Sequence, residues 1–254
     1  MTDSFAHFTL LETLGDGQLG TLSRARDSRS GRTVALRRLT LAAAADGALL
    51  DRLRQASVLS HPSVAGLYEV GVHDGTTYYA QEFVPGRGLS ELAAGHPLHP
   101  RRAIEFAVAI ADALAEAESL GLVHGALTSR AVRVNPKGHA KLLDVGFAGW
   151  PHGSAAVPDL EALGTLLREL VTGHTTRVAT VPEPLIRVLD RCASGQMGSA
   201  AVVAATLREI AASMEVGQPG PASQPSPASS GLGARWIVAG TVIAVVAGLL
   251  WLAR

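Results

Sequence analysis

Apolar residues follow two different periods along this chain of 254 residues, and the period changes near residue 86. Before that point, short extended runs separated by Gly-containing turns predict strands. The expected strands are 8–16, 19–27, 32–39, 67–72 and 77–84, with one helix over 42–60 between the third and the fourth. The first part of the chain is therefore expected to be mainly β.

After Gly88 the helical period dominates. A helix is expected over 101–120, because Pro100 suits its first turn and Ile104, Val108, Ala111 and Leu114 form an apolar stripe. Three more helices are expected over 159–171, 185–193 and 199–214. A mainly β part followed by a mainly α part predicts an α+β fold of two lobes, residues 1–85 and 86–216.

A third pattern marks the C-terminal end of the sequence. Residues 236–253 carry no charge. A helix of this length is about 27 Å long, close to the hydrocarbon thickness of a bilayer. We therefore expect one C-terminal transmembrane helix, preceded by a disordered Pro/Ser/Gly linker over 217–235.

The expected membrane helix carries a stripe of small residues, Gly240, Ala244 and Gly248, at four-residue spacing. Such stripes allow two helices to approach closely, which suggests a homodimer. The N-terminus has no basic segment followed by an apolar one, so a secretory signal is not expected. The expected location is the inner (plasma) membrane, single-pass, with the globular domain in the cytoplasm.

Charge and cysteine content limit the kinds of partner and the cellular compartment that suit this chain. The 22 basic and 22 acidic residues balance, which argues against a nucleic-acid partner. The single cysteine, Cys192, cannot form an intramolecular disulfide, which fits a reducing compartment.

A Gly-rich segment with Gly15, Gly17 and Gly20 lies between two expected strands. A dinucleotide-binding loop would lie between a strand and a helix, so that interpretation is not favoured. Five further motifs follow in order: Val34-Ala35-Leu36-Arg37, His61-Pro62, Gln81-Glu82-Phe83-Val84, Val123-His124 and Leu143-Asp144-Val145-Gly146. In order and spacing, residues 8–214 resemble the bacterial Ser/Thr protein kinases of the eukaryotic-like (Hanks) type.

The resemblance implies a bilobal protein-kinase-like fold, with a β-rich N-lobe, an α-helical C-lobe and a trimmed activation segment. It also implies ATP and Mg²⁺ as cofactors. It places five residues at nucleotide contacts and one at the metal. These are Gly15, Gly17, Gly20, Ala35 and Arg37 for the nucleotide, and Asp144 for the metal.

The chain departs from the family pattern where catalysis is performed. Ala126, Thr128 and Ala131 stand at the positions of the catalytic Asp, the Lys near the phosphate and the Mg²⁺-binding Asn. Arg37 replaces the third-strand Lys, and Arg52 stands where its Glu partner is expected. Arg133 lies where the family has an apolar residue beneath the adenine.

These departures predict a catalytically inactive pseudokinase, a membrane-tethered scaffold or regulator in signalling with a protein partner. Two alternatives stay open. The intact glycines, Arg37 and Asp144 would suit a nucleotide-binding sensor. A weakly active, atypical Ser/Thr kinase would need Arg37 or Asp51 to compensate for the lost groups.

Overall fold

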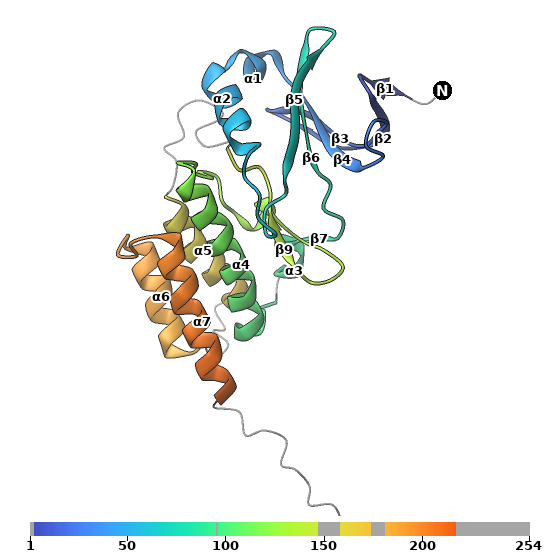
Figure 1. Ribbon diagram of the computed structural model, residues 1–254. Helices are drawn as coiled ribbons and strands as arrows, with labels where there is room; N and C mark the ends of the chain where they lie inside the picture. Colours follow the sequence, from blue (N-terminus) through green and yellow to red (C-terminus); the bar gives the residue numbers. More distant parts are fainter. Residues whose placement is uncertain (1–2, 95, 147–157, 174–180, 217–254) are drawn as a thin grey trace, which may run out of the picture. The chain divides into compact units, whose positions relative to one another are not determined.

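The first part of the chain folds into a six-stranded antiparallel sheet (Figure 1). Its order along the sheet is β1-β2-β3-β4-β6-β5. The strands are β1 (Ser4–Phe5), β2 (Phe8–Gly17), β3 (Gly20–Asp27), β4 (Thr33–Leu39), β5 (Leu67–His73) and β6 (Thr76–Glu82). This computed structural model describes residues 3–94, 96–146, 158–173 and 181–216. The five expected strands are confirmed, and β1 is an addition that the pattern did not predict.

The single helix expected over 42–60 is wrong, because two helices occupy that segment. They are α1 (Leu41–Ala45) and α2 (Gly47–Ala56). Asp46 between them is extended, with ψ of 95°, and its Oδ1 accepts a hydrogen bond from Leu49 N at 2.9 Å. A short Asp side chain that caps the next helix competes with helix continuation at that residue. The break leaves α2 as a separate helix that ends at Ala56.

The two faces of the sheet have separate cores, because successive strand residues point to opposite faces. On one face, Leu36 and Tyr78 pack with Phe8. On the other, Leu39 and Tyr79 pack with side chains of α1 and α2. Tyr78 and Tyr79 are adjacent in β6 and nearly fully buried, so this strand is covered on both sides.

A second, three-stranded sheet links the two parts of the chain. It comprises β7 (Arg87–Gly88), β8 (Val132–Val134) and β9 (Ala140–Leu142), with the short helices α3 (Leu89–Leu92) and η1 (Ser129–Ala131) beside it. Leu142 N donates to Ser63 O at 2.8 Å, and Ala65 N donates to Leu142 O at 2.9 Å. The sequence pattern did not predict these elements, since strands of two or three residues are too short to show a period.

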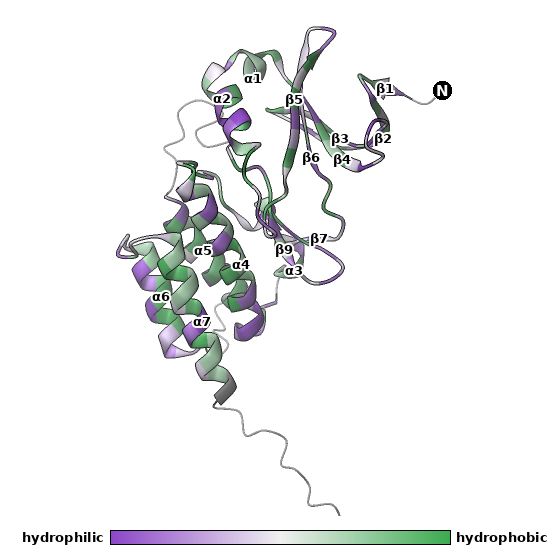
Figure 2. Cartoon of the chain, viewed as in Figure 1, coloured by the Kyte–Doolittle hydropathy of each residue, from purple (hydrophilic) through white to green (hydrophobic). Residues whose placement is uncertain are grey.

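The four expected long helices are confirmed within a few residues. They are α4 (Pro100–Ser119), α5 (Asp159–Thr172), α6 (Glu183–Ala193) and α7 (Ala200–Val216). Figure 2 shows hydrophobic and hydrophilic residues alternating around α4 and α6. Leu114, Leu163 and Leu189 are among the residues of their shared core. Gly164 of α5 lies so close to α6 that a Cβ there would be 2.7 Å from Cys192 Cβ.

Internal contacts divide the chain into two units, Met1–Glu215 and Val216–Arg254. Both expected lobes, apart from Val216, belong to the first unit. The linker expected over 217–235, the membrane helix over 236–253 and its Gly240-Ala244-Gly248 stripe lie outside the described residues. Of the helices that the structure describes, none has the length and apolar character needed to cross a membrane.

Candidate functional site

The Gly-rich hairpin between β2 and β3 contains glycines of two kinds. Gly20 has a φ of 119°, and a Cβ there would be 1.9 Å from Arg38 O. The fold itself therefore requires glycine at position 20. Gly15 and Gly17 differ, because a Cβ at either would meet no described atom within 4 Å. Both are exposed, so the packing around them does not explain their presence.

A cavity of about 330 Å³ lies beneath this hairpin. Leu14 and Leu22 come from the hairpin, Ala35 from β4 and Leu143 from the segment after β9. Another side is formed by Gln81 and Glu82 at the end of β6, by Phe83 and Val84 directly after it, and by Glu12 of β2. Ala35, which the sequence assigned to a nucleotide site, is therefore part of a real cavity.

Arg133 of β8 also lines this cavity. Its Nε donates to Val84 O at 3.0 Å, and its Nη2 donates to Gly86 O. The sequence raised the problem of a guanidinium meeting an apolar face at this position. The structure resolves it, because the charged group reaches across to two backbone carbonyls.

Arg37 and Asp144 are joined through a residue that the sequence interpretation missed. The Nε of Arg37 donates to the Tyr79 hydroxyl at 2.8 Å, and its Nη1 donates to Gly20 O at 3.3 Å. The Tyr79 hydroxyl in turn hydrogen-bonds the Asp144 side chain. Burial, with the nearby Asp144 charge, raises the pKa of Tyr79 well above its ordinary value. The hydroxyl therefore stays protonated and can accept from the arginine while donating to the carboxylate.

Asp144 is held from a second side as well. Gln81 Nε2 donates to Asp144 Oδ1 at 3.3 Å. The backbone of Asp144 is left-handed, with φ of 56°, which is uncommon for a residue other than glycine. Such a conformation persists only where the surroundings impose it, and it concentrates at functional positions.

Arg52 of α2 hydrogen-bonds to a different part of the chain from Arg37. Its Nε donates to Gly146 O at 3.1 Å. Arg37 and Arg52 thus each have a separate neutral oxygen partner, in agreement with the expectation that two arginines cannot form the ion pair of the family pattern. The contact fastens α2 to the segment that follows Asp144.

The loop that begins at His124 is held by hydrogen bonds to Asp159 and to Leu143. The two carboxylate oxygens of Asp159, the first residue of α5, accept from His124 N and Gly125 N, each at 2.7 Å. The buried His124 ring bonds through Nε2 to Leu143 O at 2.8 Å, and its Nδ1 accepts from Ala126 N at 3.3 Å. Both bonds suit the neutral ring with hydrogen on Nε2. Burial lowers the pKa of His124, which keeps the ring neutral.

The three substituted positions follow on this supported loop. Ala126 and Thr128 are exposed, and Ala131 closes the turn with its N–H donating to Thr128 O at 3.0 Å. Alanine side chains supply neither a charge nor a lone pair. The structure therefore presents the loop in an ordered form, with methyl groups at two of the three positions.

Of the two positions at which the family pattern places Mg²⁺ ligands, Asp144 offers a carboxylate and Ala131 offers none. Magnesium prefers an octahedral set of oxygen ligands that includes one or two carboxylates. No cluster of three His, Cys, Asp or Glu side chains suited to a metal occurs in the part of the chain that the structure describes. The single candidate, Asp144, is already hydrogen-bonded by Gln81 and Tyr79.

Sequence reasoning missed Tyr79 and named Gln81 only as part of a motif, although one signal was available. Arg37 and Tyr79 are direct cross-strand partners in the β4–β6 pairing, and Ala35 is paired with Gln81 in the same register. Correct strand pairing would have placed Tyr79 beside Arg37.

Comparison with known proteins shows which family the sequence matches. The model of the protein tyrosine and serine/threonine kinase family matches residues 8–153. The Ser/Thr-protein kinase PrkC of Bacillus subtilis is 29% identical over 197 residues, which cover 66% of this chain and 30% of PrkC. PkaA of Streptomyces coelicolor is 29% identical over 250 residues, covering 73% of this chain and 46% of PkaA.

PknB of Mycolicibacterium smegmatis is 29% identical over 150 residues, covering 56% of this chain and 24% of PknB. The aligned part thus spans less than half the length of each of these three relatives. The family match covers more than half of the chain. The chain therefore belongs to the protein kinase family, among the bacterial Ser/Thr kinases of the Hanks type.

Proposed function

We propose that this chain is a catalytically inactive kinase-family protein that acts as a scaffold or regulator in signalling. The observation that carries the proposal is the loop after His124. Asp159 and His124 hold this loop by four hydrogen bonds, yet the residue at the position of the catalytic base is Ala126. The chain keeps the architecture of the loop and lacks its reactive group.

The missing groups act at separate steps of phosphate transfer. A positioned general base contributes about 10²–10⁴-fold in rate, and Ala126 cannot accept a proton. The position of the second metal ligand is Ala131, and Asp144 is engaged by Gln81 and Tyr79. Loss of base and metal ligand together would reduce phosphate transfer below any useful rate.

Transfer of radiolabelled γ-phosphate by the full chain tests this proposal. We expect no incorporation above background into the chain itself or into a generic basic protein. Ala126→Asp alone should restore nothing, because the metal ligand would still be missing. Transfer by the wild-type chain that Asp144→Ala abolishes would overturn the proposal, since a contaminating kinase would be unaffected by that substitution.

The proposal also includes a membrane tether through residues 236–253. Their uncharged composition supports it, because 18 uncharged residues suffice to span a bilayer. Fractionation of cells that express the full chain, or the chain without 236–253, tests the tether. The full chain should remain in membranes washed with alkaline carbonate, and the deletion should move the protein to the supernatant. Release of the full chain by carbonate would refute it.

A further inference from the structure

The cavity beneath the Gly-rich hairpin raises the question of what it can bind. Its walls include Leu14, Leu22, Ala35 and Leu143, and its volume is about 330 Å³. Pockets of about 300 Å³ and more accept small organic ligands, so volume alone does not exclude a purine base. The answer depends on the polar atoms at its edges.

Arg133 already occupies the polar edge of the cavity. Its Nε and Nη2 donate to the carbonyls of Val84 and Gly86, in the segment that joins the two parts of the chain. Val84 is 3% exposed, so its carbonyl lies in a largely water-free environment. Gly86, in contrast, is exposed, so only the bond to Val84 is shielded from water. Hydrogen bonds from a charged donor are stronger than neutral ones.

The two residues that the resemblance assigns to phosphate and metal, Arg37 and Asp144, have partners as well. Arg37 is bound to the Tyr79 hydroxyl and to Gly20 O, while Asp144 is bound by Tyr79 and Gln81. Arg37 and Asp144 therefore already have hydrogen-bond partners within the protein. A ligand would have to displace these bonds before it gained its own.

We infer that the Arg133 guanidinium occupies the edge of the cavity where a purine base would hydrogen-bond to the backbone of residues 84–86, so that the native protein does not bind ATP. A base entering the cavity would have to displace the guanidinium from both carbonyls. That displacement would break two charge-assisted hydrogen bonds, which a neutral base could not replace with bonds of equal strength. This goes beyond the absence of phosphate transfer, because an inactive kinase could still bind nucleotide.

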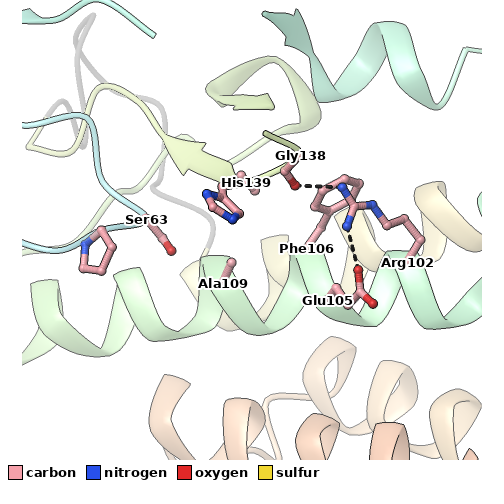
Figure 3. A pocket seen from close by; sticks show the side chains of 9 residues that line it. Ser63, Arg102, Glu105, Phe106, Ala109, Gly138 and His139 are labelled. Carbon is pink, nitrogen blue, oxygen red and sulfur yellow. Dashed lines mark hydrogen bonds and ion pairs between the residues drawn. The ribbon is translucent and has the colours of Figure 1, made fainter. Parts of the chain in front are cut away.

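Arg102 provides a matched control (Figure 3). Its Nη2 also donates to a backbone carbonyl, Gly138 O at 2.7 Å, and its Nη1 donates to Glu105 at 2.6 Å. Its guanidinium lies 4.3 Å from the centre of the Phe106 ring. Arg102 lines a separate cavity of about 360 Å³ beside α4. Replacing it removes the same kind of bond without opening the cleft.

Isothermal titration of the full chain with adenosine, with ATP, and with ATP plus Mg²⁺ tests the inference. We expect no saturable binding by the wild type or by Arg102→Leu up to millimolar ligand. Arg133→Leu and Arg133→Met should bind adenosine and ATP at least tenfold more tightly, and Mg²⁺ should add nothing. Wild-type binding of ATP at micromolar concentration would overturn the inference while leaving the proposed lack of transfer intact. A folded Arg133→Leu that binds no better than wild type would also overturn it.

A measurement on the wild type does not depend on how the variants fold. The Arg133 Nε–H should give a distinct ¹⁵N-correlated NMR signal, assigned by its loss in Arg133→Met or by arginine-selective labelling. We expect that signal to be slow in exchange and unchanged by 5-fold excess ATP. Movement of the signal on addition of ATP would show that nucleotide displaces Arg133 and would contradict the inference.

Discussion

Arg37 and Tyr79 face each other across strands β4 and β6, and the Arg37 Nε lies 2.8 Å from the Tyr79 hydroxyl. This bond replaces the ion pair that the family pattern places at the third-strand cation. The partner is a fully buried tyrosine in a strand, whereas the pattern has a carboxylate in a helix. Tyr79 also hydrogen-bonds Asp144, so one hydroxyl links the positions of the phosphate contact and of the metal ligand.

Tyr79→Phe should lower the free energy of unfolding by about 1–3 kcal/mol, because it leaves polar groups of Arg37 and Asp144 without this partner. Urea unfolding followed by circular dichroism measures the change. Tyr68→Phe is the control, since Tyr68 is 45% exposed and its ring would keep its contact with Arg32. An equal loss in both variants would argue against the buried hydroxyl as the cause.

Asp159→Asn should destabilise the protein by about 1.5–3 kcal/mol, because the carboxylate accepts from two backbone N–H groups and an amide has only one oxygen. The lost negative charge at the start of α5 adds a smaller unfavourable effect. The control is Glu161→Gln, an exposed acidic residue in the same first turn. If the two variants unfold at the same urea concentration, the helix charge rather than the loop contact explains the effect.

Gly20→Ala should cost about 1–3 kcal/mol or more, because position 20 has φ of 119° and a Cβ would overlap Arg38 O. Gly15→Ala and Gly17→Ala should each change stability by less than about 0.5 kcal/mol, since a Cβ there meets no described atom within 4 Å. Thermal unfolding of the three variants gives the comparison. A large loss in Gly15→Ala would mean that the hairpin adopts a tighter conformation than described.

The buried His124 should make the fold sensitive to acid. Burial lowers its pKa in the folded state, so below the ordinary value of about 6.5 the unfolded chain binds a proton that the native state rejects. Stability contributed by the neutral ring is therefore present at pH 7.5 and is lost as the pH falls below about 6.5.

Urea unfolding at pH 7.5 and 5.5 measures this loss in wild type and in His124→Gln. The variant should be less stable than wild type at pH 7.5 and should show a smaller further loss at pH 5.5. His139→Gln, which removes an exposed histidine in the turn before β9, should retain the wild-type loss. If His124→Gln loses as much stability between pH 7.5 and 5.5 as wild type, a group other than His124 causes the acid sensitivity.

Only part of the site could be predicted from the sequence. Motif order assigned Ala35, Arg37, Arg133 and Asp144 to one site. In the structure Ala35 and Arg133 line one cavity, while Arg37 and Asp144 both interact with Tyr79. The bonds themselves were not foreseen. The Arg37–Tyr79 and Arg133–Val84 hydrogen bonds join residues 42 and 49 positions apart, so no local pattern reports them.

The sequence by itself determined the long helices, the main strands and the family. A helix or strand buries side chains at a fixed spacing along its own length, every 3.6 residues in a helix and every two in a strand. This spacing can be recognised in the sequence. Tertiary structure decided the break at Asp46, the short linking sheet and the partners of each charged group in the cleft. These features depend on strand register and on burial. A buried cation needs an oxygen partner, and in this fold that oxygen comes from a distant part of the chain.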